Sequence, residues 1–389
     1  MHLSKISLAL RQWGSAGFSP LSLFASGEQG VWFDPSDLST MFQDSAGTTP
    51  VTVDGQPVGL ILDKSKGLTL GPELVTNGDF SNGVVGWTKT AYCTLTESGG
   101  VATLTATAAA VVSCTAPVIP TVAGKTYKLT CRLDSFLGGL SSFQLRVGTT
   151  SGGFDLGYVD NATSKSFYFT ATTTTSWVSV RISSSSPGQG LAFDNVSCKE
   201  IAGNHASQAT AAARPLYKTD GTYHWLQFDG VDDYLSTAAI DFTVTRNVSI
   251  FSGAYKSING YRIIYELGPI TDSTDGSFCL FSEFYAYGRG TSVEFVQSTQ
   301  AINTKFITTQ LVYLQTLFLS LSINGGTPVT ETGMNNITFS NNTLFIGSRN
   351  GAGNRFSGRI YSIIVRGALS TTQEITDTET WVNGKTRAY

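Results

Sequence analysis

The stretch Tyr127-Lys-Leu-Thr-Cys-Arg-Leu133 decides the fold, because its apolar and polar residues alternate one by one. Successive side chains of a β-strand point to opposite faces, so this pattern predicts a strand with one face on a core and one in water. The same alternation recurs in residues 143–147 and 178–182. Turn-forming pieces such as Pro187-Gly-Gln-Gly190 separate these segments. Short strands at regular spacing, joined by such turns, are typical of a β-sandwich.

The composition is that of a turn-rich, sparsely charged chain. Of 389 residues only 14% are charged, while glycine occurs 41 times. Such a chain has room for two or three domains and suits β-structure. The net charge of −3 offers no electrostatic basis for binding nucleic acid, and no apolar run reaches the ~20 residues of a membrane span. The five cysteines show no Cys-x-x-Cys or Cys/His spacing, so buried free thiols are expected rather than a disulfide framework or zinc site.

The second half of the chain repeats the β pattern and ends in a helical one. Leu226-Gln-Phe-Asp-Gly-Val-Asp-Asp-Tyr-Leu235 predicts two strands around a tight turn, and Asn324-Gly-Gly326 predicts a hairpin. Further strands are expected at 317–323, 344–347 and 360–366. Ser370-Thr-Thr-Gln373 fits a capping box before a terminal helix with Ile375 and Val382 inward. We therefore expect a second sandwich that closes with a short helix.

Polar segments on either side of residues 68–202 predict how the two sandwiches are joined. Leu62-Asp-Lys-Ser-Lys-Gly67 and Gly203-Asn-His-Ala-Ser-Gln208 would form one continuous polar loop if 68–202 were removed. Insertions are tolerated at exposed loops because the ends of a domain usually lie close together. The expected all-β organisation has an N-terminal segment at 1–30 and a jelly roll at 68–202, inserted in a sandwich built from 31–67 and 203–389.

Several segments carry a family resemblance to sugar-binding domains. Glu73-Leu-Val-Thr-Asn-Gly-Asp-Phe-Ser81 with Gly86-Trp87, and Leu191-Ala-Phe-Asp-Asn-Val-Ser-Cys198, resemble the first and last strands of jelly-roll carbohydrate-binding modules of the galactose-binding-like type. Residues 222–385 resemble a laminin-G-like, concanavalin-like lectin sandwich. These resemblances imply a protein that binds sugar rather than reacting with it.

A second resemblance lies in the segments that flank the insertion. Gly30-Val-Trp-Phe-Asp-Pro-Ser-Asp-Leu-Ser39, continuing to Leu62-Asp-Lys-Ser65, is similar to the start of many tailed-bacteriophage structural proteins. Asn204–Thr210 and Arg214-Pro215 belong to the same pattern. The resemblance implies a virion component of the tail or a fibre, attached through residues 1–30, that assembles as an oligomer with other virion proteins. Assembly in the bacterial cytoplasm fits the free cysteines and the lack of a convincing signal peptide.

Candidate sugar contacts in the jelly roll are Trp177, Arg181, Tyr92 and Trp87. Sugar rings present apolar C–H faces that stack on aromatic rings, while polar side chains bond their hydroxyls. Trp177 shares its strand face with Ser179 and Arg181, so an aromatic side chain stands on the polar face of this strand. Cross-strand packing is the structural alternative for Trp177, and a place in the core is the alternative for Trp87.

Candidate calcium ligands follow from the jelly-roll resemblance. Asp79 and Asp194 match positions near the structural calcium of such modules, although Ser81 stands where the family typically offers Glu. Calcium needs several hard oxygen ligands, so the loss of one weakens the site. A second acidic group surrounds a glycine turn and either bonds backbone amides or holds calcium: Asp229, Asp232 and Asp233.

The lectin-like half offers a loop at the rim of its sandwich. Arg349 and Asn354 belong to a Gly-rich loop between Gly347 and Gly353 or flank it. Binding residues gather on such loops, so both residues are candidate ligand contacts. Solvated turn chemistry is the alternative.

Nothing in the sequence predicts catalysis. Glycoside hydrolysis requires a pair of carboxylates, whereas Glu266, Glu283 and Glu294 each stand alone in the sequence. No nucleophile motif or phosphate loop occurs. We therefore expect a non-enzymatic phage virion protein that binds a host cell-surface glycan. The alternatives are a purely structural tail or capsid protein and, less favoured, a polysaccharide depolymerase.

Overall fold

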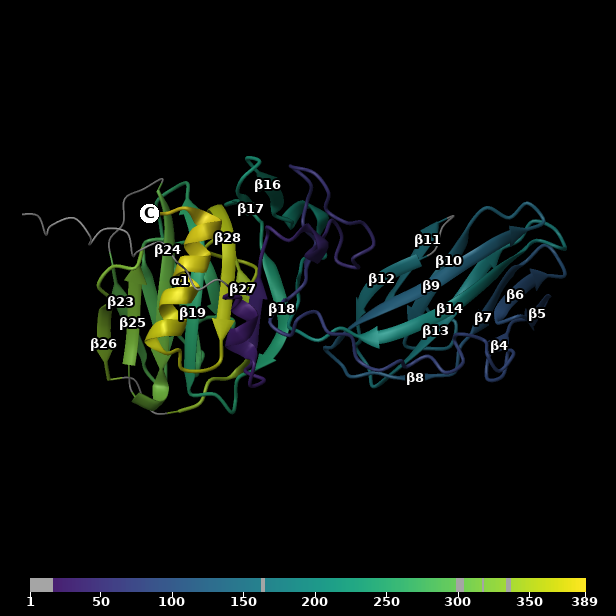
Figure 1. Cartoon of the computed structure of the whole chain (residues 1–389), viewed down its shortest axis with the longest axis horizontal. Coiled ribbons are helices and arrows are strands. Elements are labelled where there is room, and N and C mark those ends of the chain that lie inside the picture. Colours follow the sequence, from purple (N-terminus) through teal and green to yellow (C-terminus); the bar gives the residue numbers. More distant parts are fainter. Residues whose placement is uncertain (1–16, 162–164, 299–303, 317, 334–336) are drawn as a thin grey trace, which may run out of the picture. The chain divides into compact units, whose positions relative to one another are not determined.

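The computed structural model describes residues 17–161, 165–298, 304–316, 318–333 and 337–389. Within these ranges the chain is all-β, with antiparallel sheets that form sandwiches and one C-terminal α-helix (Figure 1). The predicted fold class is confirmed. Most of the predicted 1–30 segment, residues 1–16, lies outside the described residues, as does Leu317 of the predicted 317–323 strand.

Backbone contacts divide the chain into two compact units. Unit 1 contains the described residues up to Gln43 together with Pro50–Gly67 and Gly203–Tyr389, and unit 2 contains Asp44–Thr49 and Leu68–Ala202. Residues 44–49 differ from the expected division, which assigned all of 31–67 to the lectin-like sandwich. Within unit 2 the amide of Tyr168 donates a 2.7 Å hydrogen bond to the Ala46 carbonyl. This backbone bond holds the short segment in unit 2.

Unit 1 is a sandwich of two antiparallel sheets, which we call sheets A and B. Their inward side chains form one core, in which Val248 and Ile250 from sheet A meet Phe278 and Leu280 from sheet B. Sheet A contains β16 (Leu216–Thr219), β17 (His224–Asp229), β28 (Ser357–Arg366), β19 (Asn247–Lys256), β24 (Lys305–Tyr313), β25 (Phe318–Ile323) and β26 (Val329–Thr332), with β1 (Gly30–Phe33) on β28. Sheet B contains β2 (Met41–Phe42), β3 (Leu60–Ile61), β15 (Ala206–Ser207), β18 (Leu235–Asp241), β27 (Asn341–Ile346), β20 (Ile263–Leu267), β21 (Ser277–Phe281), β22 (Tyr285–Arg289) and β23 (Val293–Gln297).

The chain leaves unit 1 after Gly67 and returns to it at Gly203, and a buried carboxylate joins these two ends. Asp63 is fully buried and accepts hydrogen bonds from the amides of Trp32 (2.8 Å) and Asn204 (2.7 Å). The Asp63 amide in turn donates to His205 Nδ1 at 2.9 Å. Because β1 pairs with β28 and β3 with β15, strands from both sides of 68–202 share the same sheets.

A helix packs on the outward face of β28, β19 and β24 in sheet A (Figure 1). Helix α1 (Thr372–Thr386) packs Val382 against Phe251, Ile307 and Ile364, which point away from the main core. Its capping box uses Thr371 and Glu374, one residue later than the predicted Ser370 box. The Glu374 carboxylate also pairs with Arg366 at 2.9 Å, and this second contact favours the later start. Four 3-10 helices complete the described residues of unit 1: η1 (Pro20–Phe24), η2 (Leu38–Thr40), η3 (Ala211–Ala213) and η4 (Leu314–Thr316).

Unit 2 is a second antiparallel sandwich, made of sheets C and D. Leu129 and Phe193 from sheet C pack against Val178 and Val180 from sheet D in its core. Sheet C contains β12 (Lys165–Thr170), β9 (Thr126–Leu137), β14 (Gly190–Glu200), β6 (Val101–Ala106) and β5 (Cys93–Ser98). Sheet D contains β11 (Gly157–Asn161), β10 (Phe143–Gly148), β13 (Thr175–Ser183), β7 (Val111–Thr115) and β4 (Thr88–Lys89), with β8 (Ile119–Pro120) on β13.

Two further features bear on the sequence predictions. All five cysteines are buried and carry free thiols. In the described part of the chain, no helix has the length and apolar character needed to cross a membrane.

Candidate functional site

The outward face of sheet D brings polar side chains from three strands together. β10 pairs with β13 so that Gln144 lies opposite Arg181 and Arg146 opposite Ser179. β11 places Asp160 opposite Gln144. The alternate residues of the same strands are buried in the core of unit 2, so the polar residues face outward. We call this surface the Arg146 face and define it by Gln144, Arg146, Phe154, Tyr158, Asp160, Trp177 and Arg181.

One amide side chain orders the centre of the Arg146 face. Gln144 Oε1 accepts hydrogen bonds from Arg181 Nη1 at 2.7 Å and from Arg146 Nε and Nη2 at 2.9 and 2.5 Å. Gln144 Nε2 donates to Asp160 Oδ2 at 2.9 Å. Burial, and then the neighbouring charge of Arg181, lowers the pKa of Arg146. The row therefore holds two like charges side by side in a fixed geometry.

Aromatic rings flank this polar row. The Arg146 guanidinium lies over Phe154 and Tyr158, at 4.6 and 5.9 Å from the ring centroids. Phe154 is 51% exposed and Tyr158 47% exposed, which is high for large apolar side chains. Trp177 is half-buried and lies opposite Gly148, where Gly153 and Asp155 occupy the space that a side chain would take. The face thus combines exposed rings with oriented hydrogen-bond donors.

A buried hydroxyl lies between Trp177 and Arg181. Ser179 is fully buried on the outward side of β13. Its Oγ has no hydrogen-bond partner among the described residues. A buried polar group without a partner carries a free-energy cost of ~1–3 kcal/mol, so the strand holds Ser179 there at some expense of stability.

Two of the predicted sugar contacts lie elsewhere in unit 2. Trp87 is only 8% exposed and packs against Phe80 and Phe193 in the core, while its Nε1 donates to the Asn77 carbonyl at 3.1 Å. This burial corresponds to the structural alternative, and we leave Trp87 out of the Arg146 face. Tyr92 is 66% exposed in the turn between β4 and β5, with a φ of 62°. The structure therefore brings Trp177 and Arg181 together on β13 and separates Trp87 from them.

The two predicted calcium ligands have different surroundings. Asp79 accepts hydrogen bonds from the amide and hydroxyl of Ser81 and, with Glu73, lines a groove of about 450 Å³. Asp194 instead forms an ion pair with Arg132 at 2.8 Å. A metal site would need at least three His, Cys, Asp or Glu ligand atoms close together. Among the described residues, neither Asp79 nor Asp194 belongs to such a group. A calcium role for Asp79 and Asp194 stays a prediction.

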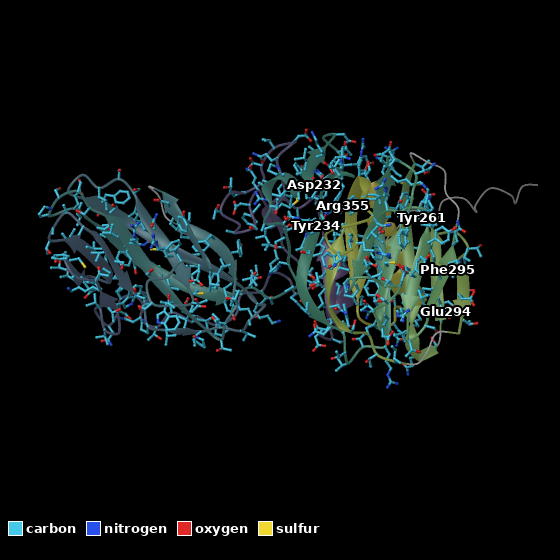
Figure 2. All side chains as sticks on the ribbon, turned by 180° about the vertical axis from the view of Figure 1, so that it is seen from behind. Asp232, Tyr234, Tyr261, Glu294, Phe295 and Arg355 are labelled. Atoms are coloured by element: carbon cyan, nitrogen blue, oxygen red, sulfur yellow. The ribbon has the colours of Figure 1, made fainter. Side chains whose placement is uncertain are left out.

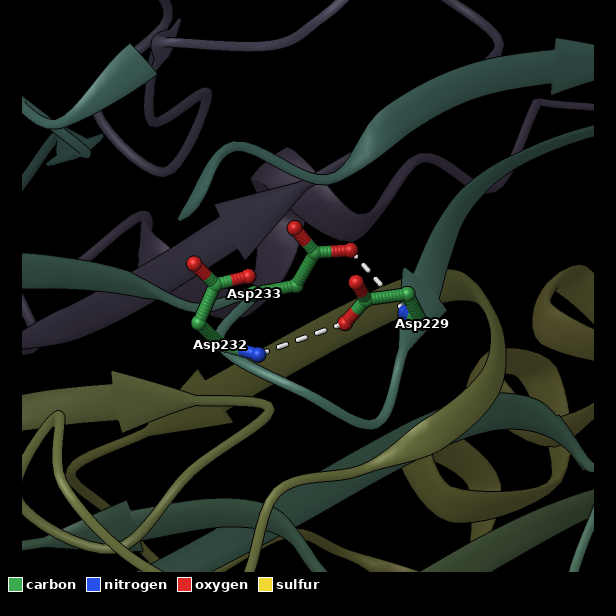
Figure 3. Close-up of side chains that lie close together, drawn as sticks. All are labelled: Asp229, Asp232 and Asp233. Atoms are coloured by element: carbon green, nitrogen blue, oxygen red, sulfur yellow. Dashed lines mark hydrogen bonds between the residues drawn. The ribbon is translucent and has the colours of Figure 1, made fainter. Parts of the chain in front are cut away.

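Such a group of three does occur at Asp229, Asp232 and Asp233, whose carboxylate oxygens lie within 4.8 Å of one another (Figure 3). Asp229 Oδ1 accepts from the amides of Val231 (2.7 Å) and Asp232 (3.4 Å), and Asp233 Oδ2 accepts from the Asp229 amide (2.9 Å). Burial raises the pKa of Asp233 to about 6. These bonds show the carboxylates stabilising the turn itself, as one of the two sequence interpretations expected.

In unit 1, Arg349 and Asn354 lie beside an aromatic cluster that the sequence analysis did not identify. Arg349 pairs with Glu266 and Asp272, each at 3.2 Å, and lies 5.3 Å from the centroid of Phe281. Burial raises the pKa of Glu266, against the opposing effects of its Thr271 hydrogen bonds and of Arg349. The charge of Arg349 is thus engaged inside the protein.

The aromatic cluster lies on the outward side of β21, β22 and β23. Asn354 Nδ2 donates to the carbonyl of Tyr261 at 2.7 Å, which ties the rim loop to one edge of the cluster. Tyr261 is 55% exposed and Phe295 51% exposed (Figure 2). The neighbouring ring centroids are 5.3–6.5 Å apart, and the members are Tyr261, Phe281, Tyr285, Tyr287 and Phe295. The alternation of Tyr285 and Tyr287 with small residues was the available signal in the sequence.

No family model matches the sequence, and no curated protein matches it. Among solved structures, the binding domain of botulinum neurotoxin serotype D shares 10% identity and a TM-score of 0.34, covering 45% of this chain and 50% of that one. The SAP-like pentraxin from Limulus polyphemus shares 15% identity and a TM-score of 0.31, covering 40% of this chain and 82% of that one.

A further structure, the serotype D ligand-binding domain in complex with N-acetylneuraminic acid, shares 12% identity and a TM-score of 0.33 and covers 44% of this chain and 47% of that one. The chain spans about half the length of the neurotoxin chains it matches. All three are distant likenesses of β-sandwich proteins.

Proposed function

We propose that this chain is a non-catalytic glycan-binding protein and that the Arg146 face of unit 2 holds the sugar. The observation that carries the proposal is the hydrogen-bonded row Arg181–Gln144–Arg146, flanked by exposed rings on the open face of a sheet. Sugar rings need an apolar surface for their C–H faces and directional partners for their hydroxyls. The Arg146 face supplies both from rigid strands.

The guanidinium groups keep donors for a ligand. Each has five N–H donors, and the bonds to Gln144 use one on Arg181 and two on Arg146. Since Gln144 fixes both groups before a ligand arrives, little side-chain entropy is lost on binding. The two guanidinium charges outnumber the one carboxylate of the face, that of Asp160, and so favour a glycan with electron-rich or acidic substituents.

Trp177→Ala tests this proposal. We expect the purified protein to give saturable binding on a bacterial glycan array, and the substitution to weaken that binding by about tenfold or more, since aromatic anchors dominate such contacts. Phe295→Ala is the control, because it removes an exposed ring from unit 1. Unchanged binding by Trp177→Ala and Arg181→Ala, with loss in Phe295→Ala, would contradict the proposal and favour the aromatic cluster.

The proposed setting is a tailed-phage virion, in which several copies bind the host surface during attachment. The support is the similarity of residues 30–65 and 204–215 to tailed-phage structural proteins. Multivalency raises avidity by ~10²–10⁴ over a single weak site. Mass spectrometry of purified particles would detect the chain in the virion, and antibodies to it would block adsorption. Absence from the particle would contradict this setting.

A structural role within a larger assembly is the second candidate function. The exposed aromatic cluster of sheet B favours it, because tyrosine and phenylalanine are enriched at protein interfaces. In that case Phe295→Ala impairs particle assembly and glycan binding is absent. The proposed lack of enzymatic activity is tested separately, by release of reducing ends from host polysaccharide.

A further inference from the structure

A second concave site lies in unit 1, at the end of helix α1 that is nearest the start of β17. Its volume is about 470 Å³, within the ~300–1,000 Å³ usual for small-ligand sites. Tyr223 and Trp381 supply aromatic walls, and Thr222, His224 and Lys385 supply polar groups. We call it the Trp381 groove. Its residues come from three separate parts of the sequence, so no local pattern revealed it.

Contacts with neighbouring side chains fix the positions of the residues that line the Trp381 groove. The buried Trp32 packs almost perpendicular to Trp381, with ring centroids 5.6 Å apart. The Tyr217 hydroxyl lies 2.7 Å from His224 Nδ1, which orients the imidazole and leaves Nε2 for a ligand. Lys385 donates to Ser36 Oγ at 2.5 Å. Groups fixed in this way bind without a large ordering cost.

The glycine at position 384 has no structural reason to be there. It lies inside α1, where glycine costs ~1 kcal/mol relative to alanine. A Cβ at Gly384 would meet no atom within 4 Å, and its backbone is not left-handed. Neither packing nor backbone conformation therefore requires glycine. Gly384 lines the Trp381 groove, and its missing side chain leaves room on the helix side.

The charges around the groove are balanced. Lys385 lies 3.5 Å from Asp34, which is also paired with Lys64 beside Asp37. A lysine ammonium lies over one face of each aromatic wall: Lys305 is 4.4 Å from the ring centroid of Tyr223, and Lys385 is 4.8 Å from that of Trp381. Asp220 accepts a hydrogen bond from the Tyr223 amide at 2.8 Å, and its negative charge lies near Lys305. With aromatic walls and no net charge, the groove suits an uncharged polyhydroxy ligand better than an anion or a cation.

We propose that the Trp381 groove is a second saccharide site, separate from the Arg146 face, that takes a neutral sugar ring. The ring packs between the aromatic walls, and its hydroxyls bond His224 Nε2 and the Thr222 hydroxyl. Single-sugar sites of this kind bind weakly, near the millimolar range that corresponds to about −4 kcal/mol.

Fluorine NMR of the full chain labelled with 5-fluorotryptophan tests this site. The probes are the methyl glycosides of glucose, galactose, mannose and N-acetylglucosamine, with glucuronic acid and glucosamine as charged comparisons. We expect at least one neutral glycoside to shift the Trp381 resonance saturably, in the wild type and in Gly384→Ala. Gly384→Gln fills the groove and should weaken this response by more than tenfold. Tyr223→Leu provides an independent second variant with the same expected loss.

The Trp177 resonance reports the Arg146 face in the same spectra, so failure of one site is distinguishable from failure of the other. The proposal is overturned if none of the four glycosides shifts Trp381, or if Gly384→Gln responds as strongly as Gly384→Ala. A response to the charged sugars alone overturns the assignment to neutral sugars.

Discussion

Sheet A of unit 1 and sheet D of unit 2 are each one layer of an antiparallel sandwich, but their outward faces differ in character. The outward face of sheet A is apolar beneath α1, whereas that of sheet D is polar. Sheet A presents Phe251, Ile307 and Ile364, all buried beneath α1. Sheet D presents the Arg146 face to solvent. A strand that is apolar on both faces needs a covering layer, whereas an alternating strand leaves one face free. A ligand can therefore reach the outward face of β10 and β13 in unit 2, whereas α1 covers the outward face of β19, β24 and β28 in unit 1.

The largest expected effect concerns the hydrogen bonds of Asp63, which hold the two segments of unit 1 together. It tests how much these bonds contribute to the stability of unit 1. Asp63→Ala removes the acceptor of the Trp32, Ser65 and Asn204 amides, which are bonded at 2.7–2.8 Å. Leaving several buried donors unsatisfied should destabilise unit 1 by about 3–5 kcal/mol. Hydrogen exchange followed by mass spectrometry should show faster exchange in unit 1 peptides and unchanged exchange in unit 2. Asp63→Asn is the control, because it keeps one oxygen acceptor; equal protection in Asp63→Ala and wild type would refute the expectation.

The next effect concerns the open sheet. Gln144→Leu removes the oxygen that joins Arg146 and Arg181, so the two guanidinium groups lose their common partner. We expect glycan affinity to fall by about 10- to 100-fold, which corresponds to about 1.4–2.8 kcal/mol. Unit 2 should keep its melting temperature. Titration calorimetry with the glycan identified on the array measures the loss, and Gln144→Glu should retain more affinity because it keeps the acceptor.

Sequence patterns identified several strands of each sandwich but not the neighbours of each strand. The alternation in 143–147 and 178–182 predicted β10 and β13, and it placed Trp177 and Arg181 on one face. It did not place Gln144 beside Arg181, because that contact depends on the register of two strands whose paired residues lie 37 positions apart in the sequence. Period-two patterns define faces, whereas partners across a sheet follow from the packing of the whole core.

The sequence also could not predict which residue caps α1 or where the Trp381 groove lies, because both depend on contacts made in the folded chain. Ser370 and Thr371 both precede a residue suitable for a capping box, and Thr371 is the N-cap because Glu374 also pairs with Arg366 at the end of β28. The Trp381 groove combines side chains near positions 36, 223 and 384, which only the folded sheet brings together. Long-range contacts of this kind leave no local signal.

A smaller effect is expected from the acidic turn formed by Asp229, Asp232 and Asp233, which should make the stability of unit 1 depend on pH. Burial raises the pKa of Asp233 to about 6, against a usual value of 3.8, with Asp229 and Asp232 acting in the same direction and Arg355 opposing them. Between these values the folded state holds a proton that the unfolded state has lost, so unit 1 stability falls as pH rises from about 4 to 6.

Asp233→Asn removes this charge and keeps an acceptor for the Asp229 amide. We expect it to stabilise unit 1 by about 1–3 kcal/mol at pH 7 and to have little effect at pH 4. Urea unfolding across this pH range measures the difference. A stabilisation that is the same at pH 4 and pH 7 would show that the Asp233 charge is not its cause.

The smallest effect contrasts two glycines, one from each unit. Gly384→Ala adds a Cβ where no atom lies within 4 Å, so it should stabilise unit 1 by about 0.5–1 kcal/mol through the higher helix propensity of alanine. Gly148→Ala places a Cβ 2.5 Å from the Gly153 carbonyl carbon and 2.7 Å from Asp155 Oδ1, so it should destabilise unit 2. Thermal unfolding of both variants gives the signs. Opposite signs mean that packing requires Gly148 and does not require Gly384; a destabilised Gly384→Ala would give that glycine a structural role instead.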